Sequence, residues 1–204
     1  MAKETRKILN EKNVFFINLM GSPGAGKTSF LKSVIPHLKE KYRIGVMEAD
    51  VDSDVDTKAI QALGVKVVQL HSGGLCHMDA DMTARGLEYL GMDDVDVIFL
   101  ENIGNLVCPA EFDTGANLKV MILSLPEGDD KPLKYPLMFE ISDIVLVSKI
   151  DTKAVFDFDT KRFRKNLDLR HPDVPVFYFS FKTKEGVEEI ITCLIKNIEE
   201  GRKQ

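Results

Sequence analysis

The sequence Gly21-Ser22-Pro23-Gly24-Ala25-Gly26-Lys27-Thr28 follows an apolar run at 14–20. It has the pattern G-x-x-x-x-G-K-[ST], which is typical of a buried strand, a glycine-rich turn with exposed backbone N–H groups and the start of a helix. In this pattern the amides and the helix dipole hold a triphosphate, the Lys27 ammonium reaches the β- and γ-phosphates, and the Thr28 hydroxyl is placed to ligate Mg²⁺. A glycine-rich turn without a ligand is the alternative, but it would not require the Lys-Thr pair. We therefore expect a nucleoside triphosphate to bind at Gly21, Gly24, Ala25, Gly26, Lys27, Thr28 and Ser29.

Further apolar runs recur along the chain, with helix-forming segments between them. The apolar runs are 13–20, 43–50, 65–70, 95–101, 118–125, 143–149 and 174–180. The helix candidates are 27–40, 54–63, 78–90, 133–140, 159–168 and 184–200. This alternation predicts an α/β fold, a P-loop NTPase with a mostly parallel sheet of about seven strands and helices on both faces. No linker or repeat divides the chain, so we predict a single P-loop domain over 1–204, with 1–12 as a short N-terminal segment.

The composition limits the class of protein. The chain has 204 residues, 44% hydrophobic and 29% charged, with a net charge of −5. That length suits one α/β core. Because the sequence has no basic stretch, nucleic acid is not the expected partner. The charged start and the lack of a long apolar run predict no leader and no membrane contact, and hence a cytoplasmic location. The three cysteines are expected to be reduced, buried or metal-bound rather than cross-linked.

Acidic side chains follow two of the predicted strands. Because ligands bind at the carboxyl ends of the strands of such a sheet, Asp50 and Glu101 are expected to share an edge with the phosphate loop and, with Thr28, to hold Mg²⁺. Gly104 would bring a backbone amide close to the γ-phosphate. The catalytic candidates are Lys27, Asp50, Glu101 and Gly104. Asp52 and Asp54 fit better as solvated residues at a helix N-terminus.

The sequence Ser148-Lys149-Ile150-Asp151 ends another predicted strand. Many GTPases have Asn-Lys-x-Asp at this place, where the carboxylate accepts two hydrogen bonds from guanine and the lysine stem packs on the base. Ser180 and Lys182 follow the next strand and resemble the Ser-Ala-Lys loop that closes such a pocket. Adenine presents an acceptor at N1 and has no 2-amino group, so Asp151 favours guanine. Ser148 replaces the usual Asn and weakens the expected support of this pocket.

A thiol and an imidazole occur together in the loop after the third predicted strand. Cys76 and His77 are adjacent, and Cys108 follows the next strand. Two thiolates and one imidazole suit Zn²⁺ or Ni²⁺, and three ligands leave a position open. Buried cysteines are also common as small apolar side chains, so spacing alone leaves both interpretations open. For Cys193, among the apolar positions of the last helix, we favour the core.

Several segments resemble HypB, the family of nickel-incorporation GTPases of hydrogenase maturation. They are Arg6-Lys7-Ile8-Leu9-Asn10, Cys76-His77-Met78-Asp79-Ala80, Glu101-Asn102-Ile103-Gly104-Asn105-Leu106-Val107-Cys108-Pro109-Ala110-Glu111-Phe112-Asp113-Thr114-Gly115, Glu127-Gly128-Asp129-Asp130 and Lys182-Thr183-Lys184-Glu185-Gly186. The resemblance covers nearly the whole chain. It implies a GTPase that forms a homodimer on binding GTP or metal, with Cys76, His77 and Cys108 as nickel or zinc ligands at or near the interface. It also implies a HypA-type nickel chaperone and a nickel-enzyme precursor as partners.

Three features depart from the family pattern. The sequence has no Cys-rich or His-rich N-terminal tract, so we expect no nickel storage by such a tail. Asp81 stands where the family often has His, and it would ligate nickel or zinc through oxygen if one helix face presented both Asp81 and His77. Ser148 replaces Asn, as described above.

The function expected from these features is a GTP-hydrolysing metallochaperone for a nickel enzyme, hydrogenase by resemblance, with GTP/GDP, Mg²⁺ and Ni²⁺ or Zn²⁺ bound. One alternative is a nucleotide-dependent regulatory switch with a structural zinc site, and another is an insertion factor for a different nickel enzyme. A small-molecule kinase is a third, although the sequence lacks the arginine cluster of a substrate lid.

Overall fold

Seven parallel strands form one sheet in the computed structural model. The structure describes residues 1–50 and 55–203, and at positions 50, 55 and 56 it describes only the backbone. The strands are β1 (Phe15–Gly21), β2 (Ile44–Asp50), β3 (Lys66–His71), β4 (Val97–Glu101), β5 (Leu118–Ser124), β6 (Ile144–Ser148) and β7 (Val176–Tyr178). Their order across the sheet is β3-β2-β4-β1-β5-β6-β7, and every neighbouring pair is parallel. The predicted parallel sheet of about seven strands is confirmed.

Strand β1 lies at the centre of the sheet, between β4 and β5. Every residue of β1 is buried, as expected of a largely apolar run with neighbours on both edges and both faces. In register, Leu19 pairs with Glu101 of β4, and Gly21 pairs with Ile122 of β5. The loops after these strands therefore open at one edge of the sheet, where the phosphate-binding sequence begins.

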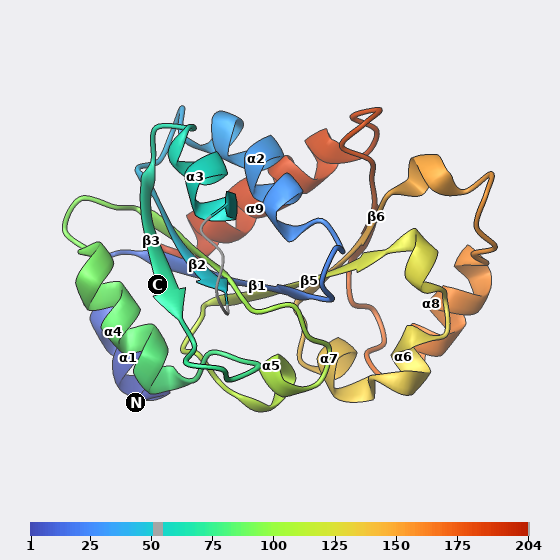
Figure 1. Cartoon of the computed structure of the whole chain (residues 1–204), viewed down its shortest axis with the longest axis horizontal. Coiled ribbons are helices and arrows are strands. Elements are labelled where there is room, and N and C mark those ends of the chain that lie inside the picture. Colours follow the sequence, from blue (N-terminus) through green and yellow to red (C-terminus); the bar gives the residue numbers. More distant parts are fainter. Residues whose placement is uncertain (51–54, 204) are drawn as a thin grey trace.

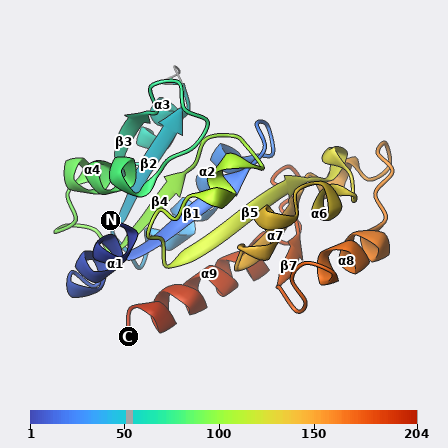
Figure 2. The same cartoon turned by 90° about the horizontal axis from the view of Figure 1, so that it is seen from below.

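Helices cover both faces of the sheet (Figure 1). They are α1 (Ala2–Glu11), α2 (Lys27–Leu38), α3 (Val55–Gln61), α4 (Ala80–Leu90), α5 (Cys108–Glu111), α6 (Lys131–Lys134), α7 (Pro136–Glu140), α8 (Thr160–Asp168) and α9 (Val187–Gly201). Apolar side chains of α2, α3 and α9 pack on one face, and those of α1, α4, α7 and α8 pack on the other. Figure 2 shows α1, α4 and α7, which cover the second of these faces, in front of the sheet. None of the helices among the described residues has the length and apolar character needed to cross a membrane.

Two elements differ from the sequence prediction. The helix expected over 133–140 is divided into α6 and α7 at Pro136, because proline has no N–H and disfavours the helical region for the residue before it. Tyr135 accordingly has φ −129° and ψ 57°. The short N-terminal segment is a helix, α1, whose Leu9 is fully buried against the second face.

Candidate nucleotide and metal site

The phosphate-binding sequence forms a loop between β1 and α2. Gly24 and Gly26 have φ of 73° and 102°, in the left-handed region that glycine tolerates best, and Gly26 immediately precedes the first residue of α2. Lys27 is buried, and its Nζ lies 3.4 Å from the carbonyl oxygen of Gly21 and 3.3 Å from that of Ser22. The loop thus holds the lysine ammonium against its own backbone at the positive end of α2, an arrangement suited to binding phosphate groups.

Hard oxygen ligands gather beside this loop. The Thr28 hydroxyl donates a hydrogen bond of 2.8 Å to Oε1 of the buried Glu101. Glu48 of β2 is also buried and pairs in register with Glu101. A hydroxyl and carboxylates of this kind fit the preference of Mg²⁺ for oxygen. The side chain of Asp50, expected to join this group, lies outside the described residues, as do Asp52 and Asp54.

A cleft of about 550 Å³ between the phosphate loop and the ends of β2 and β4 is lined by Lys27, Thr28, Glu48 and Glu101. Gly104 borders the cleft, and a Cβ added there would come within 2.8 Å of the Pro23 nitrogen. The segment after β4 therefore lies directly on the phosphate loop, and glycine is required for this approach.

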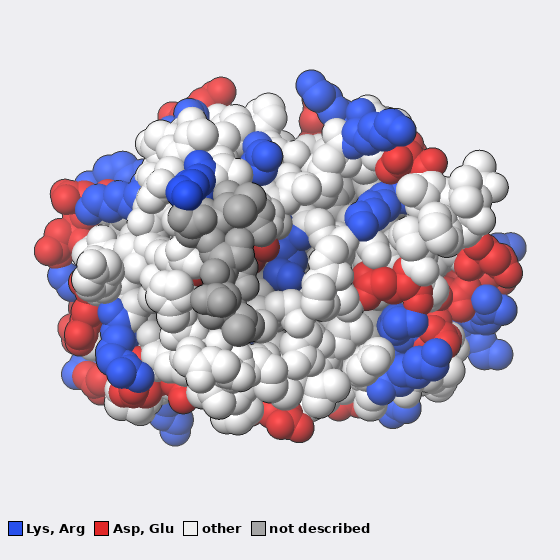
Figure 3. All heavy atoms as spheres, viewed as in Figure 1, with Lys and Arg blue, Asp and Glu red and all other residues white. Residues whose placement is uncertain are grey.

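On the face shown in Figure 3, Lys and Arg alternate with Asp and Glu around the periphery and form no single basic patch.

The predicted base-binding residues meet at the other side of the loop. Ser148 Oγ donates to the Ala25 carbonyl at 2.7 Å, and Lys149 Nζ donates to the Gly24 carbonyl at 2.7 Å. The Ser180 hydroxyl donates to Asp151 Oδ1 at 2.6 Å and accepts the backbone N–H groups of Lys182 and Thr183. The serine in place of Asn thus still fastens the end of β6 to the phosphate loop. Ser180 fixes the orientation of the Asp151 carboxylate, and its own bonds close the 180–183 turn.

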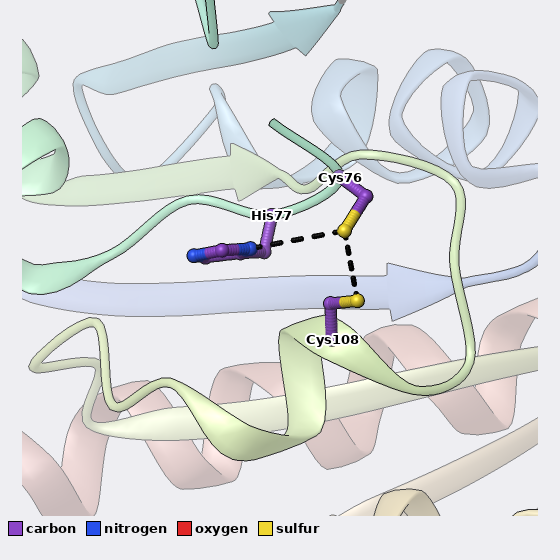
Figure 4. A group of neighbouring side chains, drawn as sticks. All are labelled: Cys76, His77 and Cys108. Carbon is purple, nitrogen blue, oxygen red and sulfur yellow. Dashed lines mark hydrogen bonds between the residues drawn. The ribbon is translucent and has the colours of Figure 1, made fainter. Parts of the chain in front are cut away.

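Cys76 and His77, from the loop after β3, lie beside Cys108, the first residue of α5 (Figure 4). The Sγ atoms of Cys76 and Cys108 and a ring nitrogen of His77 all lie within 4.8 Å of one another. The two sulfurs are 2.8 Å apart. The hydrogen bond with the Cys76 thiol, together with burial, raises the pKa of Cys108. Because metals bind the thiolate, loading this group with a metal must release protons. The His77 ring stacks on Phe112, with centroids 3.7 Å apart and planes 11° apart.

Asp81 does not join these three residues. Asp79 begins α4 by accepting the Met82 N–H, so the helix starts at Ala80 and His77 precedes it. His77 and Asp81 therefore do not share a helix face, and the expected i,i+4 pairing is wrong. Instead, Asp81 forms an ion pair of 2.7 Å with Arg85.

One segment, 102–108, contacts both the phosphate loop and the thiol group. The Asn105 N–H donates to the Gly21 carbonyl at 3.1 Å, and the Asn105 side chain donates to the Cys76 carbonyl at 3.5 Å. Its Oδ1 also accepts the Val107 N–H, which shapes the turn before Cys108. Asn105 and Phe112 lie within a motif quoted above, but their contacts depend on which strands are neighbours, and motif spacing does not give that order.

Comparisons with known proteins agree with this arrangement. A family model described as CobW/HypB/UreG, nucleotide-binding domain, matches residues 15–177. The chain is 36% identical over 200 residues to the probable hydrogenase maturation factor HypB of Methanocaldococcus jannaschii, an alignment that covers 98% of this chain and 90% of the relative. The chain belongs to the HypB branch of this family.

Two further relatives extend the comparison. The hydrogenase/urease maturation factor HypB of Helicobacter hepaticus is 39% identical over 93% of this chain and 79% of its own length. The crystal structure of HypB from Helicobacter pylori in complex with nickel has a TM-score of 0.92 and 32% identity, covering 98% of this chain and 94% of that one. The P-loop fold and the resemblance to HypB inferred from sequence are both confirmed.

Proposed function

We propose that this HypB-family chain is a GTP-hydrolysing metallochaperone that carries nickel, or zinc, as cargo and assists its insertion into a nickel enzyme. Hydrogenase is the first candidate recipient, because the relative from Methanocaldococcus jannaschii is named a probable hydrogenase maturation factor. The observation that supports it is the 102–108 segment, in which Gly104 lies on the phosphate loop and Cys108 lies beside Cys76. A rearrangement of this segment on binding or losing the γ-phosphate would move one sulfur ligand relative to the other. Nucleotide state and metal affinity would then be linked.

Each predicted site residue has a role in this proposal. Lys27 neutralises charge on the β- and γ-phosphates, and Thr28, Glu101 and Asp50 would hold Mg²⁺. Bound Mg²⁺ would supply charge neutralisation to the phosphate groups. Gly104 would present its N–H to the γ-phosphate. Asp151, oriented by Ser180, would read the guanine edge, while Lys149 would pack on the base.

The cargo site has soft ligands and is open to solvent. Cys76 is exposed, and Cys108 and His77 are partly so. Leu75, Val107 and Phe112 next to them are exposed apolar side chains. A second copy of the chain covering them would bring two ligand sets together, which supports the proposal of a homodimer formed on GTP or metal binding. A HypA-type nickel chaperone and a nickel-enzyme precursor are the further partners proposed.

The test is to titrate Ni²⁺ and Zn²⁺ into the protein in its apo, GDP-bound and non-hydrolysable-GTP-bound forms. We expect metal affinity to differ between the nucleotide forms, and GTP affinity to change by the same factor when metal is bound. Cys108→Ala should abolish the difference. Cys193→Ala is the matched control, because this thiol lies on α9 away from the group and should leave metal binding unchanged.

Other outcomes would favour the alternatives. Identical metal stoichiometry and affinity in all three forms would indicate a structural zinc site in a regulatory switch. Failure to release phosphate without an added acceptor would favour a kinase. The Helicobacter hepaticus relative is named for both hydrogenase and urease, so a different nickel enzyme is the second candidate recipient. Pull-down with each apoenzyme, followed by nickel analysis of the recipient, separates the two.

A further inference from the structure

Glu127 is the last residue of a one-turn 3₁₀ helix, Leu125–Glu127, that follows β5. Its Oε2 accepts the backbone N–H of Ser124 at 2.6 Å and the Ser124 hydroxyl at 2.7 Å. This is the pattern of a capping box, in which one carboxylate oxygen fixes the start of a helical turn. The capping box occupies Oε2 and leaves the other oxygen, Oε1, for a different partner.

Oε1 of Glu127 accepts a hydrogen bond of 2.5 Å from Oγ of Ser22, the second residue of the phosphate loop. The two residues are 105 positions apart in sequence and meet because β1 and β5 are neighbours in the sheet. Hydrogen bonds to a carboxylate are stronger than bonds between neutral groups. Glu127 therefore joins the end of β5 to the first turn of the loop, a contact that a capping box does not require.

Ser22 in turn contacts the lysine of the loop. Its carbonyl oxygen accepts the Ala25 N–H at 3.2 Å and lies 3.3 Å from Lys27 Nζ. Gly21, immediately before it, lies so close to Ile122 of β5 that a Cβ there would come within 2.3 Å of the Ile122 carbonyl oxygen. Ser22 is thus connected in two directions. Its side chain is bonded to Glu127 after β5, and its carbonyl oxygen lies beside Lys27.

We propose that Glu127 is a positioning residue for nucleotide binding, which acts through Ser22 to hold the phosphate loop and Lys27 in the conformation that receives phosphate. This rests on the proposed function only in requiring that the loop bind a nucleotide. Pre-organisation of the loop lowers the entropy lost on binding, so both GDP and GTP are held more tightly when the contact is present. Base selection, which depends on Asp151, is not affected.

The experiment compares Ser22→Ala, Glu127→Gln and the double variant with the parent, using GDP and GTP affinities and hydrogen exchange of the amides of residues 21–27 in the nucleotide-free protein. Each single variant should weaken both affinities by about fivefold, the worth of one hydrogen bond. Exchange of the loop amides should accelerate. The double variant should bind nucleotide no more weakly than the weaker single variant, because both changes weaken the Ser22–Glu127 bond. Glu127→Gln also disturbs the bonds to Ser124, and the part due to the Ser124 hydroxyl is measured separately in Ser124→Ala.

Ser124→Ala is the matched control, because it removes the hydroxyl of the capping box and leaves Ser22 and the Glu127 carboxylate in place. It should lower the melting temperature while changing nucleotide affinity less than about twofold. Parent-like affinity and exchange in Ser22→Ala, or effects of the two changes that multiply in the double variant, would overturn the positioning role alone. A parent protein that binds neither GDP nor GTP would overturn this role and the proposed function together.

Discussion

Asp151 is the residue on which guanine selection is proposed to depend, and the Ser180 hydroxyl holds its carboxylate in place. Asp151→Asn replaces an acceptor with an amide that can donate to the 2-oxo group of xanthine. We expect GTP affinity to fall by at least about tenfold and XTP affinity to rise, since one bidentate base contact is worth about 1–3 kcal/mol. Competition binding with GTP, XTP and ATP measures this. Asp157→Asn changes an exposed aspartate six positions later in the sequence, and this control should bind all three nucleotides as the parent does. Equal GTP and ATP affinity in the parent would contradict the guanine assignment.

Lys27 is the second residue whose role can be tested singly. Lys27→Ala removes the ammonium proposed to face the phosphates, so triphosphate affinity should fall by at least about tenfold and hydrolysis should be lost. Lys32→Ala on the exposed face of the same helix makes the same change of charge as a control. Phosphate release at the parent rate in Lys27→Ala would refute the assignment of the loop.

Residues within a short motif, and residues at the ends of strands that share one edge of the sheet, could be predicted from the sequence, whereas contacts that depend on which strands are neighbours could not. Lys27 and Thr28 were predicted because local spacing fixes both the loop and the helix that follows. The contact between Glu127 and Ser22 could not be predicted, because it requires β5 to lie beside β1. Asp81 was expected to join the metal site only if it shared a helix face with His77, and that condition is not met because α4 begins at Ala80, after His77.

At the scale of elements, the segment after β5 is fixed to α8 by one buried carboxylate. Asp129 accepts Arg162 Nε at 2.7 Å and Nη2 at 2.8 Å, and it also accepts the Asp159 N–H at the start of α8. Asp129→Asn should lower the free energy of unfolding by about 1–3 kcal/mol, because a charged and bidentate interaction is lost from a buried group. Urea denaturation measures the loss. Asp130→Asn, at a side chain that is 45% exposed, is the control and should cost less than about 1 kcal/mol. Equal losses would show that Asp129 is not the anchor.

The predicted strands and helices match the observed elements wherever apolar periodicity is uninterrupted, as in α9 (Val187–Gly201) against the expected 184–200. The division at Pro136 was missed because the apolar spacing continues through the proline. The α1 helix was missed because its stability depends on packing Leu9 against the sheet rather than on its mostly polar sequence.

At the scale of the whole molecule, Asp96 joins both ends of the chain to the sheet. It accepts Arg43 at the start of β2 and Arg202 after α9, and Arg202 also donates to the Asn13 carbonyl after α1. Hydrogen bonds from Arg43 hold the pKa of Asp96 well below its usual range, and those from Arg162 lower that of Asp129.

A pH dependence of stability follows from these two carboxyls. Their folded-state pKa values lie below the unfolded value of about 3.9, so their contribution is complete above that pH and is lost as the pH falls through the folded values. We expect the free energy of unfolding to decline below about pH 4, and Asp96→Asn to be less stable at neutral pH with a shallower acid decline. Urea denaturation from pH 7 to pH 3 measures both. An acid decline of unchanged slope in Asp96→Asn would contradict the assignment.

The strand order, unlike the strands themselves, could not be predicted, because several of the apolar runs are alike in composition. That order has a consequence for synthesis on the ribosome. β1 is made first, yet its two neighbours, β4 and β5, end at Glu101 and Ser124. A nascent chain stopped before Val97 contains the whole phosphate loop and neither strand that borders it. The central strand of the sheet therefore stays unpaired until about half of the polypeptide has emerged. At that stage buried segments are most exposed to aggregation and to binding by chaperones.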